Sequence, residues 1–162
     1  MITALVLSER GVEALAATLA ALVAGVAEGV VGDAVVLARR EDAAVARVAD
    51  AVGATLVVTD DPLPWRAALP LARRDWLFCL EAGDVPAHGW IAGVERFLLH
   101  PGERRCARLR RTGWPALVGA ARDLVGAPRL ASGDLVHKSL LAGGRLPRPA
   151  RLNAVLEPYR DG

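Results

Sequence analysis

The sequence predicts one α/β domain, residues 1–162, in which helices cover both faces of a mostly parallel, Rossmann-like sheet to form three α/β/α layers. Three observations lead to this fold class. The chain has 162 residues, the length of one domain. Short apolar runs alternate with stretches whose apolar residues recur at helical spacing. The run at residues 76–80 is apolar at every position, as expected for a strand that is covered on both faces.

The first hundred residues carry the alternation of strands and helices. Strands are predicted at residues 3–7, 34–38, 55–59 and 76–80, and helices at residues 11–24, 41–52, 65–72 and 89–99. Consecutive parallel strands are joined by right-handed crossovers, so this order predicts a doubly wound sheet with residues 76–80 as its central strand.

The last third of the chain is less regular. Residues 104–111 alternate weakly around Cys106 and Leu109, and their arginines favour a strand at an edge of the sheet. We expect a helix at residues 115–125, a loop at 127–134 and an apolar segment at 135–141. Prolines at 147, 149 and 158 predict an irregular tail.

Composition indicates the compartment and excludes some partners. Cys79 and Cys106 show no metal-ligand spacing, which favours a reducing cytoplasm with Cys79 as a small core residue. The longest apolar stretch, residues 14–27, is too short to span a bilayer and follows no positively charged segment, so a soluble and unprocessed chain is expected. Arginines at 104–111 would suit a lipid-linked acceptor or the inner membrane face, or a solvated edge strand. Without interleaved aromatic residues they do not indicate nucleic-acid binding.

The candidate site follows the predicted central strand. The segment Glu81-Ala82-Gly83-Asp84 places two carboxylates at the carboxyl end of that strand, where open α/β sheets bind ligands. We therefore expect residues 81–84 to line a cleft at this edge of the sheet.

The residues around this segment resemble a family 2 glycosyltransferase of the GT-A fold. The family's GDW-hydrophobic-LxAD passage is similar to RDWLFCLEAGD at residues 74–84, and its PPGW is similar to PAHGW at 86–90. Farther along, its GDxGLFVRRxxFxxxGGFP is matched loosely by SGDLVHK at 132–138 and by two glycines before Pro147. The resemblance covers most of the chain and is specific at residues 75–90. It implies a GT-A-like fold and a transferase that takes a hexose-type sugar from a nucleotide donor.

The resemblance also implies a divalent metal, manganese or magnesium, which neutralises the charge on the departing nucleoside diphosphate. In the family's acidic pattern the ligands would fall at Glu81, Gly83 and Asp84, so here the middle carboxylate is missing and the first is lengthened. Asp84 is therefore the expected metal ligand, and Glu81 is expected to hold ribose or a metal-bound water. Both are the candidate catalytic residues.

Further contacts with the nucleotide sugar are implied where other strands end, at Ser8, Arg39, Arg40 and Asp60. The two arginines would bind phosphate, or else form a solvated loop. Asp60 would assist at a phosphate-side metal, or else form part of a turn before a proline. Ala38 stands where the family has an aspartate that binds the base.

A transferase that inverts the sugar needs a general base, and the family's position for it holds Asn153-Ala154 here. The nearest acids are Asp134 and Glu157. Two functions therefore stand side by side: a small cytoplasmic glycosyltransferase with an unknown acceptor, and a GT-A domain without catalysis that serves as a binding or assembly module.

Overall fold

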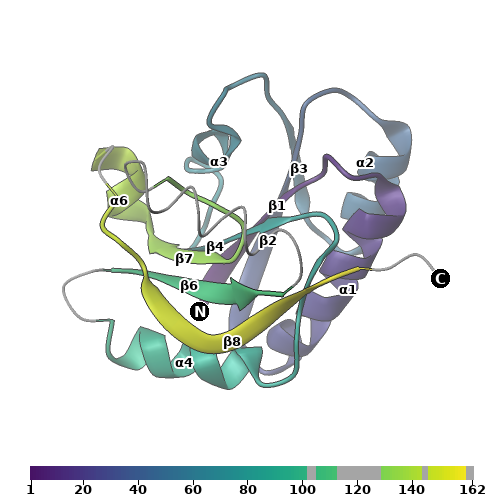
Figure 1. The fold of residues 1–162 in the computed structure, drawn as a ribbon. Helices are drawn as coiled ribbons and strands as arrows, with labels where there is room; N and C mark the ends of the chain where they lie inside the picture. Colours follow the sequence, from purple (N-terminus) through teal and green to yellow (C-terminus); the bar gives the residue numbers. More distant parts are fainter. Residues whose placement is uncertain (102–104, 113–128, 144–145, 160–162) are drawn as a thin grey trace.

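The computed structural model describes residues 1–101, 105–112, 129–143 and 146–159, and the helix predicted at residues 115–125 lies outside them. Figure 1 shows its strands and helices. The strands are β1 Ile2–Leu7, β2 Val31–Ala38, β3 Thr55–Val58, β4 Trp76–Glu81, β5 Asp84–Pro86, β6 Cys106–Arg111, β7 Asp134–His137 and β8 Ala150–Pro158. The helices are α1 Val12–Ala27, α2 Ala43–Ala51, α3 Pro64–Ala67, α4 Trp90–Leu99 and α6 Lys138–Gly143.

The strands form one mixed sheet in the order β3-β2-β1-β4-β7-β6-β8-β5. The first four in this order are parallel, as the sequence predicts, and β1 lies between β2 and β4. The loops that follow β1, β2, β3 and β4 therefore meet at one edge of the sheet. This edge is where the candidate site lies.

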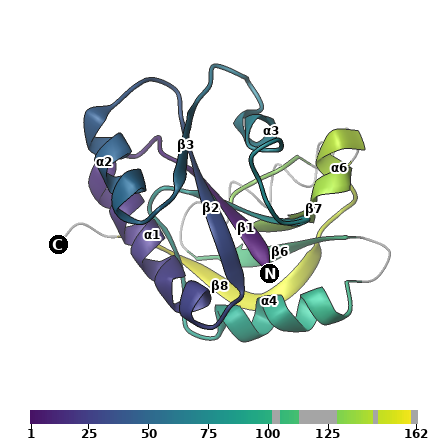
Figure 2. The same cartoon turned by 180° about the vertical axis from the view of Figure 1, so that it is seen from behind.

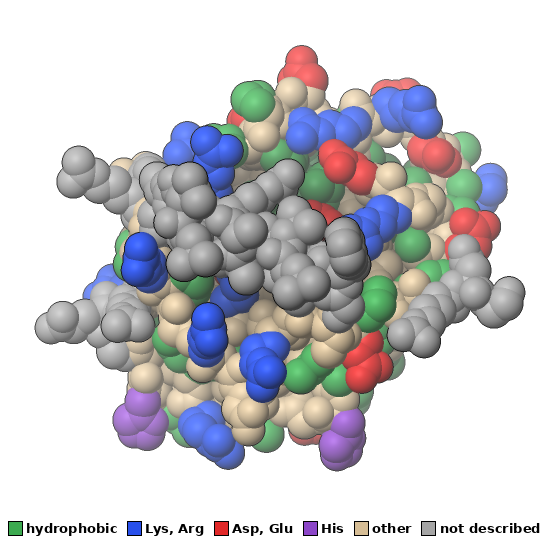
Figure 3. All heavy atoms as spheres, in the orientation of Figure 1, with side chains coloured by type: hydrophobic (Ala, Val, Ile, Leu, Met, Phe, Trp, Pro, Cys, Tyr) green, Lys and Arg blue, Asp and Glu red, His purple; other side chains and the backbone are tan. Residues whose placement is uncertain are grey.

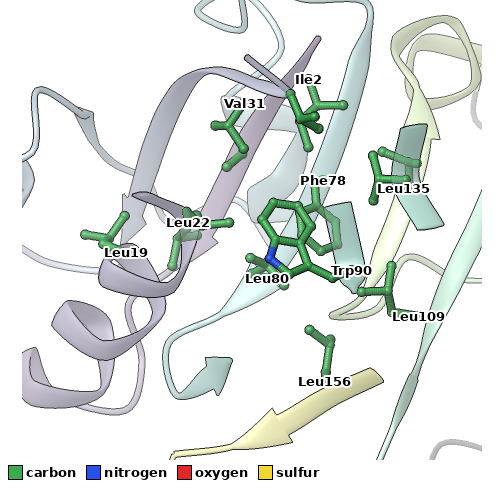
Figure 4. Close-up of a cluster of buried hydrophobic side chains, with 14 of the residues drawn as sticks. Ile2, Leu19, Leu22, Val31, Phe78, Leu80, Trp90, Leu109, Leu135 and Leu156 are labelled. Atoms are coloured by element: carbon green, nitrogen blue, oxygen red, sulfur yellow. The ribbon is translucent and has the colours of Figure 1, made fainter. Parts of the chain in front are cut away.

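Apolar side chains on alternate positions of β1, β2 and β4 divide into two cores, one on each face of the sheet. Helices α1, α2 and α4 cover one face, and α3 and α6 cover the other; α1 and α2 lie side by side in both ribbon views (Figures 1 and 2). In the larger core Phe78 of β4 stacks on Trp90 of α4, with ring centroids 5.8 Å apart (Figure 4). Cys79 faces the smaller core and is fully buried, as predicted.

Local sequence signals explain why the helices begin and end where they do. The Asp42 carboxylate caps α2 by accepting hydrogen bonds from the backbone N–H groups of Ala44 (2.8 Å) and Val45 (3.3 Å). Helix α2 stops just before Gly53, whose φ of 68° lies in the left-handed region. Another left-handed glycine, Gly89 with φ 83°, precedes α4.

The second half of the sheet corrects two predictions. Strand β6 is not at an edge, because it lies between β7 and β8. Its residues Arg108 and Arg111 are paired with buried carboxylates instead of being solvated, so their charges do not require an edge position. The tail predicted to be irregular contains the nine-residue strand β8. Its prolines lie before the strand and at its last position, while Leu152, Ala154 and Leu156 alternate inward.

Candidate functional site

The acidic segment forms the turn between β4 and β5. Glu81 is the last residue of β4 and Asp84 the first of β5. Between them Gly83 has φ 88°, and its N–H donates to the α1 residues Thr18 (Oγ1, 2.8 Å) and Ala14 (carbonyl, 3.0 Å). Glycine adopts such a left-handed φ readily, and it stands here where the family has its middle carboxylate.

Asp84 is buried, with 2% of its surface exposed, and both of its oxygens are engaged. Arg111 Nη2 donates to Asp84 Oδ1 at 2.7 Å, and the Ser132 hydroxyl donates to Asp84 Oδ2 in a short hydrogen bond. The same hydroxyl accepts the backbone N–H of Glu81 at 2.9 Å. Ser132 therefore ties the end of β4 to the start of β5.

Glu81 is the solvent-facing carboxylate of the pair. Its Oε2 lies 2.9 Å from Nη2 of Arg10, in the loop after β1, and 3.9 Å from Nη2 of Arg111, at the end of β6. The side chains of Arg10, Glu81 and Arg111 are 45%, 33% and 20% exposed. Two carboxylates and two guanidinium groups thus form a charge-balanced cluster. We call Arg10, Glu81, Asp84 and Arg111 the arginine–carboxylate cluster.

This cluster does not fit the divalent cation that the sequence predicts. Both carboxylates already carry guanidinium partners, so a cation bound to their oxygens would lie beside two positive charges. Hard cations also need several oxygen ligands. Among the described residues no group of three or more His, Cys, Asp or Glu side chains could hold a metal. The metal assignment of Asp84 and Glu81 stays a prediction.

The other predicted donor contacts lie at the same edge but do not join the cluster. The Ser8 hydroxyl donates to the Leu37 carbonyl at 3.1 Å, which ties β1 to β2. Arg39 pairs with Glu9 at 3.1 Å and donates to the carbonyl of Asp61, so it braces three loops. Arg40 and Asp60 are exposed.

Figure 3 shows basic and acidic side chains interspersed along the top of this face, over the loops that lead to α2 and α3. A ligand at this edge would therefore meet both signs of charge. Ala38, at the end of β2, is buried and offers no side-chain hydrogen bond to a base.

The candidate general bases are placed in different environments. Asp134, at the start of β7, is buried and pairs with Arg108 at 2.5 Å. Glu157 is exposed on β8, opposite Val85 of β5. Because Arg108 and Arg111 turn toward carboxylates, the structure gives no support to a lipid-linked acceptor held by the arginines of β6.

The two cysteines are not candidate nucleophiles. Burial, together with the nearby Asp134 carboxylate, raises the pKa of the Cys79 thiol well above its usual value and that of Cys106 to about 12. Both thiols therefore stay protonated and unreactive at neutral pH.

Two hollows flank the edge. One of about 410 Å³ is lined by α2 and β3 residues, including Asp42 and Leu56. The other, of about 450 Å³, is lined by leucines, Trp65, Arg66 and Arg129 near α3 and α6. Residues 81–84 line neither hollow, so the cleft predicted at the acidic segment stays a prediction.

Sequence reasoning missed three residues of this site: Arg10, Arg111 and Ser132. Arg10 and Glu81 are 71 positions apart, and Arg111 and Asp84 are 27 apart, so no local spacing marks either pair. Ser132 begins the SGD segment of the resemblance, and that motif is the only signal that could have found it.

No family model and no curated protein matches the sequence, whereas solved structures do resemble the fold. Glucosyl-3-phosphoglycerate synthase from Mycobacterium tuberculosis, crystallised with Mn2+, uridine diphosphate and glucosyl-3-phosphoglycerate, has a TM-score of 0.61 and 18% identity over 86% of this chain and 57% of its own. Mannosyl-3-phosphoglycerate synthase from Rubrobacter xylanophilus has a TM-score of 0.69 and 12% identity over 100% of this chain and 68% of its own. A mycobacterial protein has a TM-score of 0.61 and 17% identity, over 99% and 68%.

At these identities the likeness shows the fold, and it confirms the predicted GT-A-like α/β class. The chain spans 57% of the length of the glucosyl-3-phosphoglycerate synthase. Among the described residues no helix has the length and apolarity to cross a membrane.

Proposed function

We propose that this chain binds a nucleotide-diphospho-sugar at the carboxyl edge of β1, β2 and β4 and transfers the sugar to an acceptor hydroxyl. The observation that carries the proposal is the arginine–carboxylate cluster at the end of β4. It brings together the loop after β1, the turn after β4 and the end of β6, on a fold shared with enzymes crystallised with uridine diphosphate. Two guanidinium groups beside a sheet edge are suited to a diphosphate.

In the proposed reaction the bond between the sugar's anomeric carbon and the diphosphate oxygen breaks, and its electron pair leaves with the diphosphate. A bond forms between the anomeric carbon and the acceptor oxygen, whose proton passes to a base. The charge that grows on the leaving diphosphate needs a nearby positive group, and Arg10 and Arg111 supply it in this chain. Glu81 and Asp84 hold these arginines in place.

A second function is favoured by the pairing of the acids. Glu81, Asp84 and Asp134 each form an ion pair with an arginine, which is a structural role for these acids and leaves the general base unassigned. The chain could thus bind a nucleotide sugar without transferring it, as a binding or assembly module. Turnover distinguishes the two functions, since both require binding.

The test is a calorimetric titration of the full chain with uridine and guanosine diphosphates and their sugars, followed by an assay for released nucleoside diphosphate. We expect weak binding with little preference for the base, because Ala38 removes one buried hydrogen bond, worth about 1 to 3 kcal/mol or roughly ten- to a hundredfold in affinity. Absence of binding by every one of these nucleotides would contradict the proposal. Binding without release would leave the binding module as the function.

A further inference from the structure

We infer that Arg10 and Arg111 bind the diphosphate directly and take the place of a divalent cation, so that the site binds its ligand without metal. The inference rests on the proposed function and deepens it. Both arginines lie near the same carboxylate oxygen: Glu81 Oε2 is 2.9 Å from Arg10 Nη2 and 3.9 Å from Arg111 Nη2. Two positive charges thus converge where the sequence predicts a metal bound by carboxylates.

Asp84 acts in this arrangement as a positioning residue for Arg111. Its side chain is buried, and its two oxygens accept hydrogen bonds from Arg111 Nη2 and the Ser132 hydroxyl. A cation at this carboxylate would therefore share it with the guanidinium group of Arg111. Gly83, in the same turn, contributes no carboxylate.

The guanidinium groups retain donors for a ligand. A guanidinium has five N–H groups, and Arg111 contacts both carboxylates through Nη2. So far as the described residues go, the three N–H groups on Nε and Nη1 of Arg111 are free. Arg10 likewise uses Nη2 for Glu81, and nearly half of its side chain is exposed. Paired N–H groups of this kind match the oxygens of a phosphate.

The decisive test is a calorimetric titration of the full chain with uridine diphosphate and with inorganic pyrophosphate, in EDTA and in manganese chloride. We expect both probes to bind in EDTA with an affinity that manganese does not raise. If uridine diphosphate binds only with manganese, the inference is overturned while the proposed function stands. If neither probe nor any nucleotide sugar binds in either buffer, both are overturned.

Variants assign the binding to the two arginines. Arg10→Gln removes an exposed side chain, and Arg111→Lys keeps the charge beside buried Asp84 but loses the planar fork, so both variants are expected to fold. Each should weaken binding in EDTA about ten- to a hundredfold. Arg96→Gln, which removes an exposed arginine from α4, is the matched control and should bind normally. Normal binding by both Arg10→Gln and Arg111→Lys would overturn the assignment.

Glu81→Gln should change ligand affinity in opposite directions, depending on whether Glu81 binds a metal or pairs with Arg10. If Glu81 holds a metal, the substitution weakens binding. If Glu81 holds Arg10, the substitution frees that arginine and removes a negative charge, so binding of pyrophosphate in EDTA should stay unchanged or become tighter. A loss of pyrophosphate binding in Glu81→Gln would overturn the inference.

Discussion

The ion pair between Arg111 and Asp84 should be energetically coupled in solution. Removing one partner of a buried pair leaves an uncompensated charge and costs about 3 to 5 kcal/mol. Arg111 is one-fifth exposed and Asp84 is almost wholly buried, so Arg111→Gln should fall near the lower end, at about 3 kcal/mol. In a domain of this size that loss lowers the unfolding midpoint by roughly 6 to 12 °C.

A double-mutant cycle measures the coupling. Arg111→Gln, Asp84→Asn and the double variant are unfolded in urea, with the transition followed by tryptophan fluorescence and circular dichroism. The double variant replaces the charges by two amides that can hydrogen-bond, so it should lose less stability than the sum of the single variants. We expect a coupling free energy of about 2 kcal/mol. Arg96→Gln is the control for removal of one arginine. Additive losses within error would show that the pair does not form, and the reasoning on Asp84 would fail.

Three further predictions concern other parts of the chain. Gly133→Ala should destabilise the protein by about 2 to 5 kcal/mol in urea unfolding. The φ of Gly133 is 93°, and a Cβ there would lie 2.9 Å from the Cδ1 atom of Leu156. Gly143→Ala is the control and should not destabilise the protein, because a Cβ there would meet no atom within 4 Å. Burial raises the pKa of both thiols, so the unfolded chain loses these two protons at a lower pH than the folded chain does. The free energy of unfolding should therefore fall as the pH rises from about 8.5 toward 12, the pKa of Cys106. The slope is at most about 1.4 kcal/mol per pH unit for each thiol. That pH dependence should vanish in the Cys79→Ala, Cys106→Ala double variant, and its persistence there would disprove the assignment. Ala38→Asp should strengthen binding of uridine diphosphate about tenfold or more, and an unchanged affinity in calorimetry would refute the register that the resemblance implies.

The parallel half of the sheet could be predicted because its signals are local. Residues 76–80 are apolar at every position, and Asp42 caps α2 three positions before Val45, the first residue of its buried face, so period and capping suffice. The second half of the sheet, where β6 and β8 are parallel and the other pairs antiparallel, gave weaker signals. Strand β5 has three residues, and the alternation of Leu152, Ala154 and Leu156 in β8 is concealed by flanking prolines.

The candidate site could be located from sequence but not assembled. The carboxylates of residues 81 and 84 follow the central strand directly, whereas their arginine partners come from the loop after β1 and from β6. The prediction that β6 is a solvated edge strand was wrong for Arg108 and Arg111 for the same reason, while Arg110 is exposed. From sequence alone a charged side chain is predicted to be exposed unless its partner is known. Arg108 contacts Asp134 only because β6 pairs with β7.

The most direct test of the account is a crystal structure of the full chain with uridine diphosphate, grown in EDTA. The account predicts that the diphosphate lies at the end of β4, with its oxygens within hydrogen-bond distance of Arg10 and Arg111, and with Asp84 still paired to Arg111. A diphosphate bound elsewhere on the molecule, or bound there without contact to either arginine, would contradict it.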